Sequence, residues 1–462
     1  MSTNDDFDRL LGSWLSSEAS AQEPPDFHRG VIGLVRGSRQ RPRWLVVARG
    51  SIGVPLPAVR PQPRRWSAML LLAALIALLA ASVAIVGSRL LPSPSPYQDI
   101  FRLTGSLAEP RMWHTATLLA DGRVLVTGGQ TGGDGTELAT AAVWDPATGL
   151  FSPTGSMLHA RSAAAAVQLS DGRVLIVGGA SWANGTIAEA EVWDPATGAF
   201  SQAGSLAEAR RSPTATLLAD GRVLVVGGSL DWLGNVTAAT AEIWDPTTMT
   251  FRSAGSLAAA RDGHTTTLLQ DGRVLVVGGT AQVPHGDGTV SAFIATAEVW
   301  DPAAMTFSPA GSLGATRMGH AATLLTDGRV LVVGGGDCCF TIGTLGDGSD
   351  SAEIWDPGTM TFSPAGTLIH GRSGHTATLM PDGQVLVVGG YDATGYVGDT
   401  AELWDPARMT FSPAASLSEA RIRQTATLLG DGRVLVIGGE GNAPSGTGSA
   451  QVLASAELFG PP

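Results

Sequence analysis

The stretch DGRVLVVGG, or a close variant of it, recurs seven times between Ile100 and the C-terminus of this chain. Successive Asp-Gly pairs are separated by a nearly constant interval of about 50 residues. A period of this length built from strand-like segments is typical of a β-propeller, in which each repeat forms one blade. The repeat therefore predicts an all-β fold with seven blades. It leaves function open, because propellers serve both as enzymes and as binding modules.

Each repeat is predicted to form four short antiparallel strands. A segment of the type HTATLL is followed by Asp-Gly, the preferred residues of a two-residue hairpin. The apolar run that follows is expected of a strand covered on both faces. A third segment, of the type AEVWDP, ends at a proline that cannot continue a central strand, and TFSPAGSL supplies the fourth strand. Because one such sheet has two apolar faces, seven of them arranged radially cover one another.

Two repeated features carry a resemblance to a known family. The first is a glycine pair after four apolar residues, which begins at Gly128, Gly178, Gly227, Gly278, Gly334, Gly389 and Gly438. The second is an aromatic residue further on, which is Trp144, Trp193, Trp244, Trp300, Trp355, Trp404 or Phe459. This pattern resembles the kelch repeat, although Trp-Asp-Pro stands where many kelch units have Tyr-Asp-Pro. The resemblance covers roughly residues 100–462 and implies a kelch-type propeller, the type also found in galactose oxidase.

The phase of the repeat predicts how the ring closes. A segment of the fourth-strand type, around Phe101, precedes the first complete repeat. The last repeat stops just after Phe459, an aromatic residue of the third-strand type. We therefore expect residues 100–107 to complete the seventh blade as its outermost strand, beside residues 451–459.

A long apolar stretch without any charged residue runs from Trp66 to Gly87. At about 1.5 Å per residue a helix of this length spans about 33 Å, enough for a hydrocarbon core of about 30 Å. A cleaved signal peptide is the alternative, but its apolar region is typically about 7–15 residues long and lies behind a short basic start. The stretch here is longer and begins far from the N-terminus, at Trp66. The sequence therefore predicts a transmembrane helix over residues 66–88.

Arginine residues flank this predicted helix unequally. Eight of them lie between Arg36 and Arg65, whereas Arg89 and Arg102 are the near ones on the other side. The positive-inside rule then predicts a single-pass protein of the cell membrane with a cytoplasmic N-terminus and an extracytoplasmic propeller. The predicted domains are a largely disordered, Arg-rich tail with a short amphipathic helix (1–65), the transmembrane helix (66–88), a Pro/Ser linker (89–98) and the propeller (99–462).

Charge is divided along the same boundary. Residues 99–462 contain 18 Arg and 35 Asp or Glu, whereas residues 1–65 contain 10 Arg and 6 Asp or Glu. An acidic propeller repels phosphates, which disfavours nucleic acid as a ligand. The basic tail is expected either to rest on anionic lipid or to dock a cytoplasmic partner. The chain contains no lysine and is rich in alanine, glycine and arginine, a composition that suggests a GC-rich bacterial genome.

Two charged positions recur from blade to blade and are best explained by the blade itself. An arginine precedes each first strand, at Arg111, Arg161, Arg210, Arg261, Arg317, Arg372 and Arg421. A glutamate precedes the third-strand aromatic in six blades, at Glu191, Glu242, Glu298, Glu353, Glu402 and Glu457, with Ala142 in the remaining one. We expect ion pairs between the two sets, in preference to a ring of arginines that binds an anion.

Four histidines, His114, His264, His320 and His375, recur at another position. Equivalent atoms of neighbouring blades should lie about 10 Å apart, whereas zinc needs ligands at about 2 Å. Capping of the strand start is therefore favoured over a metal site, and no cofactor is predicted. Catalysis is not indicated either: a copper radical oxidase of the galactose-oxidase group would use tyrosines, and only Tyr97, Tyr391 and Tyr396 are present.

The blades differ most in the loop between the second and third strands. The segment from the glycine pair to the aromatic residue is longer in the fourth, fifth and seventh units than in the other four. These loops should emerge on the same face as the connections from each fourth strand to the next blade, opposite the Asp-Gly hairpins. That face is the predicted ligand-binding face. Its candidate residues are Trp182, Trp232, His285, Asp287, Phe293, Asp337, Cys338, Cys339, Phe340, Asp347, Asp350, Tyr391, Asp392 and Tyr396.

The adjacent pair Cys338-Cys339 leaves three interpretations open: a vicinal disulfide, a soft-metal site, or two buried small residues. Aromatic and carboxylate side chains suit stacking on a sugar or capture of a cationic or calcium-bearing surface, and equally suit plain solvated loops. The predicted function is a membrane-anchored propeller that binds a protein or a glycan. An enzyme with an unrecognised site at the propeller mouth is one alternative, and a single-pass signalling receptor is the other.

Overall fold

The computed structural model describes residues 100–460, except residues 133–134, 233, 286–287, 337–347, 393 and 443–449. The described residues belong to one of the two units into which the chain divides, Ser93–Pro462. The predicted tail (1–65), transmembrane helix (66–88) and linker (89–98) lie outside the described residues. Within the described part of the chain, no helix is long and apolar enough to cross a membrane.

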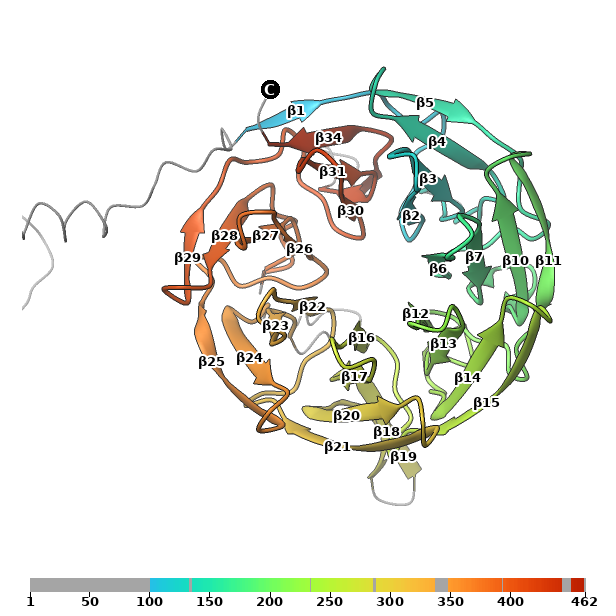
Figure 1. Cartoon of the computed structure of the whole chain (residues 1–462). Helices are drawn as coiled ribbons and strands as arrows, with labels where there is room; N and C mark the ends of the chain where they lie inside the picture. The colour runs from blue at the N-terminus through green and yellow to red at the C-terminus, as the bar shows by residue number, and fades with distance from the viewer. Residues whose placement is uncertain are drawn as a thin grey trace, which may run out of the picture. The chain divides into compact units, whose positions relative to one another are not determined.

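The described residues form seven four-stranded antiparallel sheets, arranged as the blades of a propeller (Figure 1). The first and innermost strands are β2 (Thr115–Leu118), β6 (Ala165–Gln168), β12 (Thr214–Leu217), β16 (Thr265–Leu268), β22 (Ala321–Leu324), β26 (Thr376–Leu379) and β30 (Thr425–Leu428). The second strands are β3 (Val124–Thr127), β7 (Val174–Val177), β13 (Val223–Val226), β17 (Val274–Val277), β23 (Val330–Val333), β27 (Val385–Val388) and β31 (Val434–Ile437).

The outer half of each blade follows after a loop. The third strands are β4 (Ala141–Asp145), β10 (Glu189–Asp194), β14 (Thr240–Asp245), β20 (Thr296–Asp301), β24 (Ser351–Asp356), β28 (Ala401–Asp405) and β34 (Ala456–Phe459). The fourth strands are β5 (Leu150–Pro153), β11 (Ala199–Ser205), β15 (Thr250–Ser256), β21 (Thr306–Ser312), β25 (Thr361–Thr367), β29 (Thr410–Pro413) and β1 (Phe101–Leu103). Short hairpins lie in three of the second-to-third-strand loops, namely β8–β9 (Ala180–Ser181, Gly185–Thr186), β18–β19 (Thr280–His285, Gly288–Phe293) and β32–β33 (Glu440–Gly441, Gln451–Val452).

The core lies between adjacent blades. Every residue of the second strands is buried, which confirms the prediction that these apolar runs are covered on both faces. The third-strand tryptophan fills the space toward the preceding blade: Trp244 of β14 packs with Leu175 of β7 and Val192 of β10. Its indole Nε1 also donates to the Ala203 carbonyl at 2.9 Å, so this buried polar atom is satisfied.

The ring closes as the repeat predicts. β1 pairs antiparallel with β34, with Phe101 opposite Phe459 and Leu103 opposite Glu457, and completes a sheet of order β1-β34-β31-β30. The rings of Phe101 and Phe459 lie 5.0 Å apart between centroids. The closing strand is shorter than residues 100–107, but its place as the outermost strand of the seventh blade is confirmed (Figure 1).

Deletion of residues 99–107 should destabilise the whole propeller, because it exposes Phe459 and unpairs β34. Burial of one aromatic side chain contributes about 1.5–3 kcal/mol, so we expect the free energy of unfolding to fall by at least about 2 kcal/mol. Urea denaturation followed by tryptophan fluorescence measures this loss. Deletion of residues 93–98 is the matched control and should leave the unfolding free energy unchanged; equal stability of both deletion variants would contradict the closure.

Candidate functional site

Two sets of connections meet on one face of the propeller, which we call the loop face. The connection from each fourth strand to the next blade forms isolated bridges with the second-to-third-strand loop of that next blade. Examples are Arg211 with Ser229, Asp262 with Thr280, and Ser373 with Tyr391. The predicted placement of these loops on a common face is therefore confirmed.

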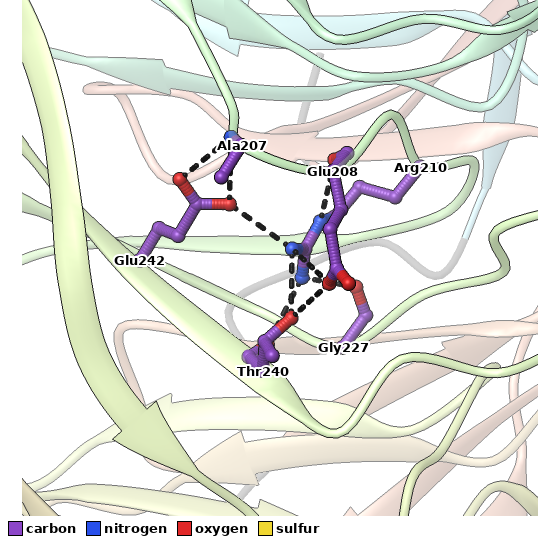
Figure 2. A network of polar contacts seen from close by, with 6 residues as sticks. All are labelled: Ala207, Glu208, Arg210, Gly227, Thr240 and Glu242. Carbon is purple, nitrogen blue, oxygen red and sulfur yellow. Dashed lines mark hydrogen bonds and ion pairs between the residues drawn. The ribbon is translucent and has the colours of Figure 1, made fainter.

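The recurring arginines are buried clamps within the blades, as Figure 2 shows for Arg210. Its Nη1 donates to the Gly227 carbonyl at 3.2 Å and to the Thr240 carbonyl at 2.9 Å. Its Nη2 lies 3.1 Å from a carboxylate oxygen of Glu242. That carboxylate in turn accepts from the Ala207 backbone N–H at 2.9 Å. One guanidinium group thus ties the incoming connection to both the second and the third strand of the blade.

Six blades share this ion pair. The Nη2–Oε1 distances are 2.7 Å for Arg161–Glu191, 3.1 Å for Arg210–Glu242, 2.6 Å for Arg261–Glu298, 2.6 Å for Arg317–Glu353, 2.7 Å for Arg372–Glu402 and 2.6 Å for Arg421–Glu457. In the first blade, where Ala142 replaces the glutamate, Arg111 instead lies 3.4 Å from Glu109. The predicted ion pairing is confirmed, and these buried guanidinium groups do not form a ring for a ligand.

Three of the four recurring histidines link neighbouring blades. The Nε2 atoms of His114, His264 and His320 each lie 3.0 Å from the hydroxyl of the threonine that begins the first strand of the preceding blade. Burial lowers the pKa of each imidazole to about 3, so the rings are neutral at physiological pH. The expected strand capping is therefore an inter-blade contact. In the described part of the chain, no three His, Cys, Asp or Glu side chains are grouped to hold a metal ion.

The fourth histidine lacks this contact. Both ring nitrogens of His375 are buried without a hydrogen-bond partner. The reason is local, because the preceding blade begins its first strand, β22, with Ala321 where the other three have Thr425, Thr214 and Thr265. A buried unpaired polar atom costs about 1–3 kcal/mol.

Replacing Ala321 by threonine should stabilise the protein, because the new hydroxyl lies where it can pair with His375 Nε2. We expect a gain of about 1 kcal/mol in the free energy of unfolding, measured by urea denaturation. Ala165→Thr is the matched control: it also begins a first strand, β6, but the following blade has Pro213 in place of histidine. A gain in the control alone, or in neither variant, would contradict this account.

The structure brings together two of the predicted ligand-face residues. Trp182, in the β8–β9 hairpin, and Trp232, after β13, meet edge to face with ring centroids 6.0 Å apart. Trp182 is 79% exposed, an unusual position for so large an apolar side chain. These two indoles from neighbouring blades therefore lie side by side on the loop face.

The remaining candidates are dispersed or not described. Asp287, Asp337, Cys338, Cys339, Phe340 and Asp347 lie outside the described residues. The β18–β19 hairpin that carries His285 at its end and Phe293 at its base lies at the edge of the ring in Figure 1. Asp350 is exposed.

In the sixth blade, Tyr391 forms a bridge with Ser373, and Tyr396 is exposed. Asp392 accepts from the Thr394 hydroxyl at 2.6 Å and from the Tyr396 N–H at 3.1 Å. Although burial favours the opposite shift, these hydrogen bonds hold the pKa of Asp392 below its usual range. Its carboxylate is thus engaged in the local turn.

A second set of residues on the loop face adjoins the two indoles and was not predicted. The guanidinium carbon of Arg211 lies 5.8 Å from the ring centroids of both Trp113 and Trp232. The guanidinium carbon of Arg423 lies 4.2 Å from the Trp113 ring centroid. Trp113, Trp182, Trp232, Arg211 and Arg423 therefore form one contiguous group, which we call the mouth cluster.

The two arginines of the mouth cluster differ in their partners. Arg423 pairs with Glu440, whereas Arg211 donates to the Trp232 carbonyl at 2.8 Å. The pKa of Arg211 is lowered mainly by burial and also by the charge of Arg423, while Asp262 opposes the shift. Asp262 is itself buried, and this burial raises the pKa of its carboxyl group to about 6, although the charge of Arg211 opposes the shift.

The sequence does contain a feature that points to the mouth cluster: two variable residues between the recurring arginine and the recurring histidine position. Two residues separate the recurring arginine from the histidine position, and they change from blade to blade. They are Met-Trp, Ser-Ala, Arg-Ser, Asp-Gly, Met-Gly, Ser-Gly and Ile-Arg in chain order. Loop length carries no trace of these substitutions, so a search guided by loop length passes over Trp113, Arg211 and Arg423.

Comparisons with known proteins agree with the architecture. The model of the family described as "tRNA wybutosine-synthesizing protein 4, beta-propeller" matches residues 108–348. No curated protein matches the sequence. A solved structure titled "Novel fungal alcohol oxidase with catalytic diversity among the AA5 family, in complex with copper" is similar, with a TM-score of 0.59 and 19% identity over 79% of this chain and 76% of that one. At this identity the likeness concerns the fold alone.

Proposed function

We propose that this chain, which belongs to the family of β-propellers described as "tRNA wybutosine-synthesizing protein 4, beta-propeller", is a binding module that captures a protein or glycan ligand on its loop face. The observation that carries the proposal is the mouth cluster. Three indole rings and two guanidinium groups gather where the blades differ from one another. Tryptophan and arginine are the residues most enriched among the energetic centres of binding interfaces.

The repeating residues support the same assignment by elimination. The recurring arginines and glutamates hold each blade together, and three of the four recurring histidines join a blade to its neighbour. A ligand must therefore be recognised by residues that do not recur. Trp182 is such a residue, and its exposure leaves most of its indole available for contact.

The binding test is an array screen of the full chain in detergent against immobilised glycans and proteins, followed by affinity measurement on each hit. The double variant Trp182→Ala/Trp232→Ala should lose at least about tenfold in affinity, since truncation of one central aromatic residue commonly costs about 1–2 kcal/mol or more. Leu150→Ala is the matched control, because Leu150 is an exposed apolar residue of the outer strand β5. Hits that bind the double variant and the parent equally would contradict a loop-face site.

We further propose that the propeller is displayed outside the cell membrane on a single transmembrane helix, residues 66–88. The uncharged stretch from Trp66 to Gly87 and the excess of arginines before it support this topology. Protease added to intact cells with a permeable outer layer should remove the propeller and leave the tail of residues 1–65 protected. A cleaved tail with an intact propeller, or a propeller recovered in the cytoplasm, would contradict the topology.

A further inference from the structure

We propose that the mouth cluster is a site for a carboxylate-bearing sugar, such as a uronic acid residue of a glycan. In this assignment the carboxylate pairs with Arg211, and the sugar ring lies against the indoles. The proposal rests on the binding function proposed above and specifies its ligand class. Three separate observations carry it: a partly buried guanidinium group without an ion pair, two large side chains at a position of positive φ, and the aromatic side chains of the loop face.

Arg211 makes no ion pair with any described acidic side chain, although the nearby charges of Asp262 and Asp231 raise its pKa against the effect of burial. Among the described residues, only Arg102, Arg211 and Arg252 have no acidic group within ion-pair distance, and Arg102 and Arg252 are exposed. Arg211 is partly buried and is bonded to the Trp232 carbonyl, with Arg423 nearby. An incoming carboxylate would complete the pairing that Glu242 provides for the adjacent Arg210.

The backbone beneath the mouth cluster is held in a conformation that bulky residues rarely adopt. Trp113 has φ of 54° and Arg423 has φ of 57°. At the equivalent position three other blades have Gly263, Gly319 and Gly374, and the remaining two have Ala163 and Ser212, all with positive φ. For non-glycine residues this left-handed conformation is costly and is often retained for function.

Hydrogen bonds between neighbouring blades hold the backbone at this position in the left-handed conformation. The N–H of Ala163 donates to the Trp113 carbonyl at 2.9 Å, and the N–H of Ser212 donates to the Ala163 carbonyl at 2.8 Å. Each of these bonds joins one blade to the next at the mouth. The fold therefore requires positive φ at this position but requires neither an indole nor a guanidinium group there.

Core packing does not account for the two bulky residues. Other bulky residues with positive φ, such as Met249 and Met305, pack against the inter-blade core, so burial offsets their strain. Trp113 belongs to none of these core clusters among the described residues, and its side chain contacts Arg211 and Arg423 instead. All seven blades have positive φ at this position, but only Trp113 and Arg423 place a large side chain there, and these side chains contribute to the surface of the mouth cluster.

The surface suits a sugar with one negative charge. The indoles of Trp182 and Trp232 offer flat apolar faces, which match the C–H face of a pyranose ring. The propeller as a whole, with 18 Arg against 35 Asp or Glu in residues 99–462, repels polyanions such as acidic peptides and nucleic acids. A single carboxylate beside a neutral ring avoids that repulsion and still reaches Arg211.

The test is isothermal titration of the full chain in detergent with D-glucuronate, D-glucose and acetate. Glucuronate should bind at least tenfold more tightly than either glucose or acetate, because only glucuronate combines the carboxylate with the ring. Arg211→Gln should remove at least tenfold of that affinity, and Arg211→Lys should restore it only in part, because lysine lacks the planar fork of donors. Arg252→Gln, at an exposed arginine without an ion pair, is the control and should bind like the parent.

Replacing the two large residues by glycine tests their role in a second way, because stability and binding should change in opposite directions. Trp113→Gly and Arg423→Gly should each raise Tm, by about 2 °C, while weakening glucuronate binding at least tenfold. Glucuronate binding no tighter than glucose, unchanged affinity in Arg211→Gln, or a lowered Tm in both glycine variants would overturn the proposal. Binding of an aspartate-rich tetrapeptide in place of glucuronate would overturn the sugar class. Array hits that survive in Arg211→Gln would leave the proposed binding function standing and this inference refuted.

Discussion

The buried guanidinium group at the entry to each blade is the interaction on which the rest of the propeller depends. It joins the connection from the preceding blade to carbonyl groups at the ends of two strands, and in six blades a buried glutamate neutralises it. Removal of one partner of such a buried pair commonly costs about 3–5 kcal/mol, since an uncompensated charge stays behind. Because Arg210 is fixed in this way, the residues that follow it, Arg211 and Ser212, are held at the mouth of the ring.

Residues that differ from the repeat at a repeated position have different consequences in different blades. Ala321 departs from the repeat, and both ring nitrogens of His375 lack a hydrogen-bond partner. Trp113 and Arg423 stand at a position of positive φ that is glycine in three blades and alanine or serine in two, and their large side chains contact each other. The first departure lowers stability, whereas the second assembles a surface. Contacts made by the substituted residue distinguish the two cases.

The sequence determined the architecture because each blade repeats the same physical requirements. The apolar runs, the buried tryptophans and the phase that pairs Phe101 with Phe459 were all readable from spacing alone. The loop face and its two adjacent indoles, Trp182 and Trp232, also followed from loop positions. Their neighbours Trp113, Arg211 and Arg423 did not, because loop length is blind to substitutions within a connection of constant length. Contacts such as that between Trp113 and Arg423 join different blades, and they depend on how the blades are arranged in the ring, which a local sequence pattern does not predict.

Because β1 pairs with β34, the ring cannot close until the last strand of the propeller has been synthesised. The first strand of the propeller to leave the ribosome is completed only by the last, since the whole of the ring lies in sequence between Phe101 and Phe459. Until then the outward faces of the two blades at the ends of the arc and the edge of β1 are exposed, and such surfaces favour association between partly folded chains. A chain that ends before the seventh blade would therefore form an open arc with an uncovered blade at each end. The ring closes only once β34 has been synthesised and can pair with β1.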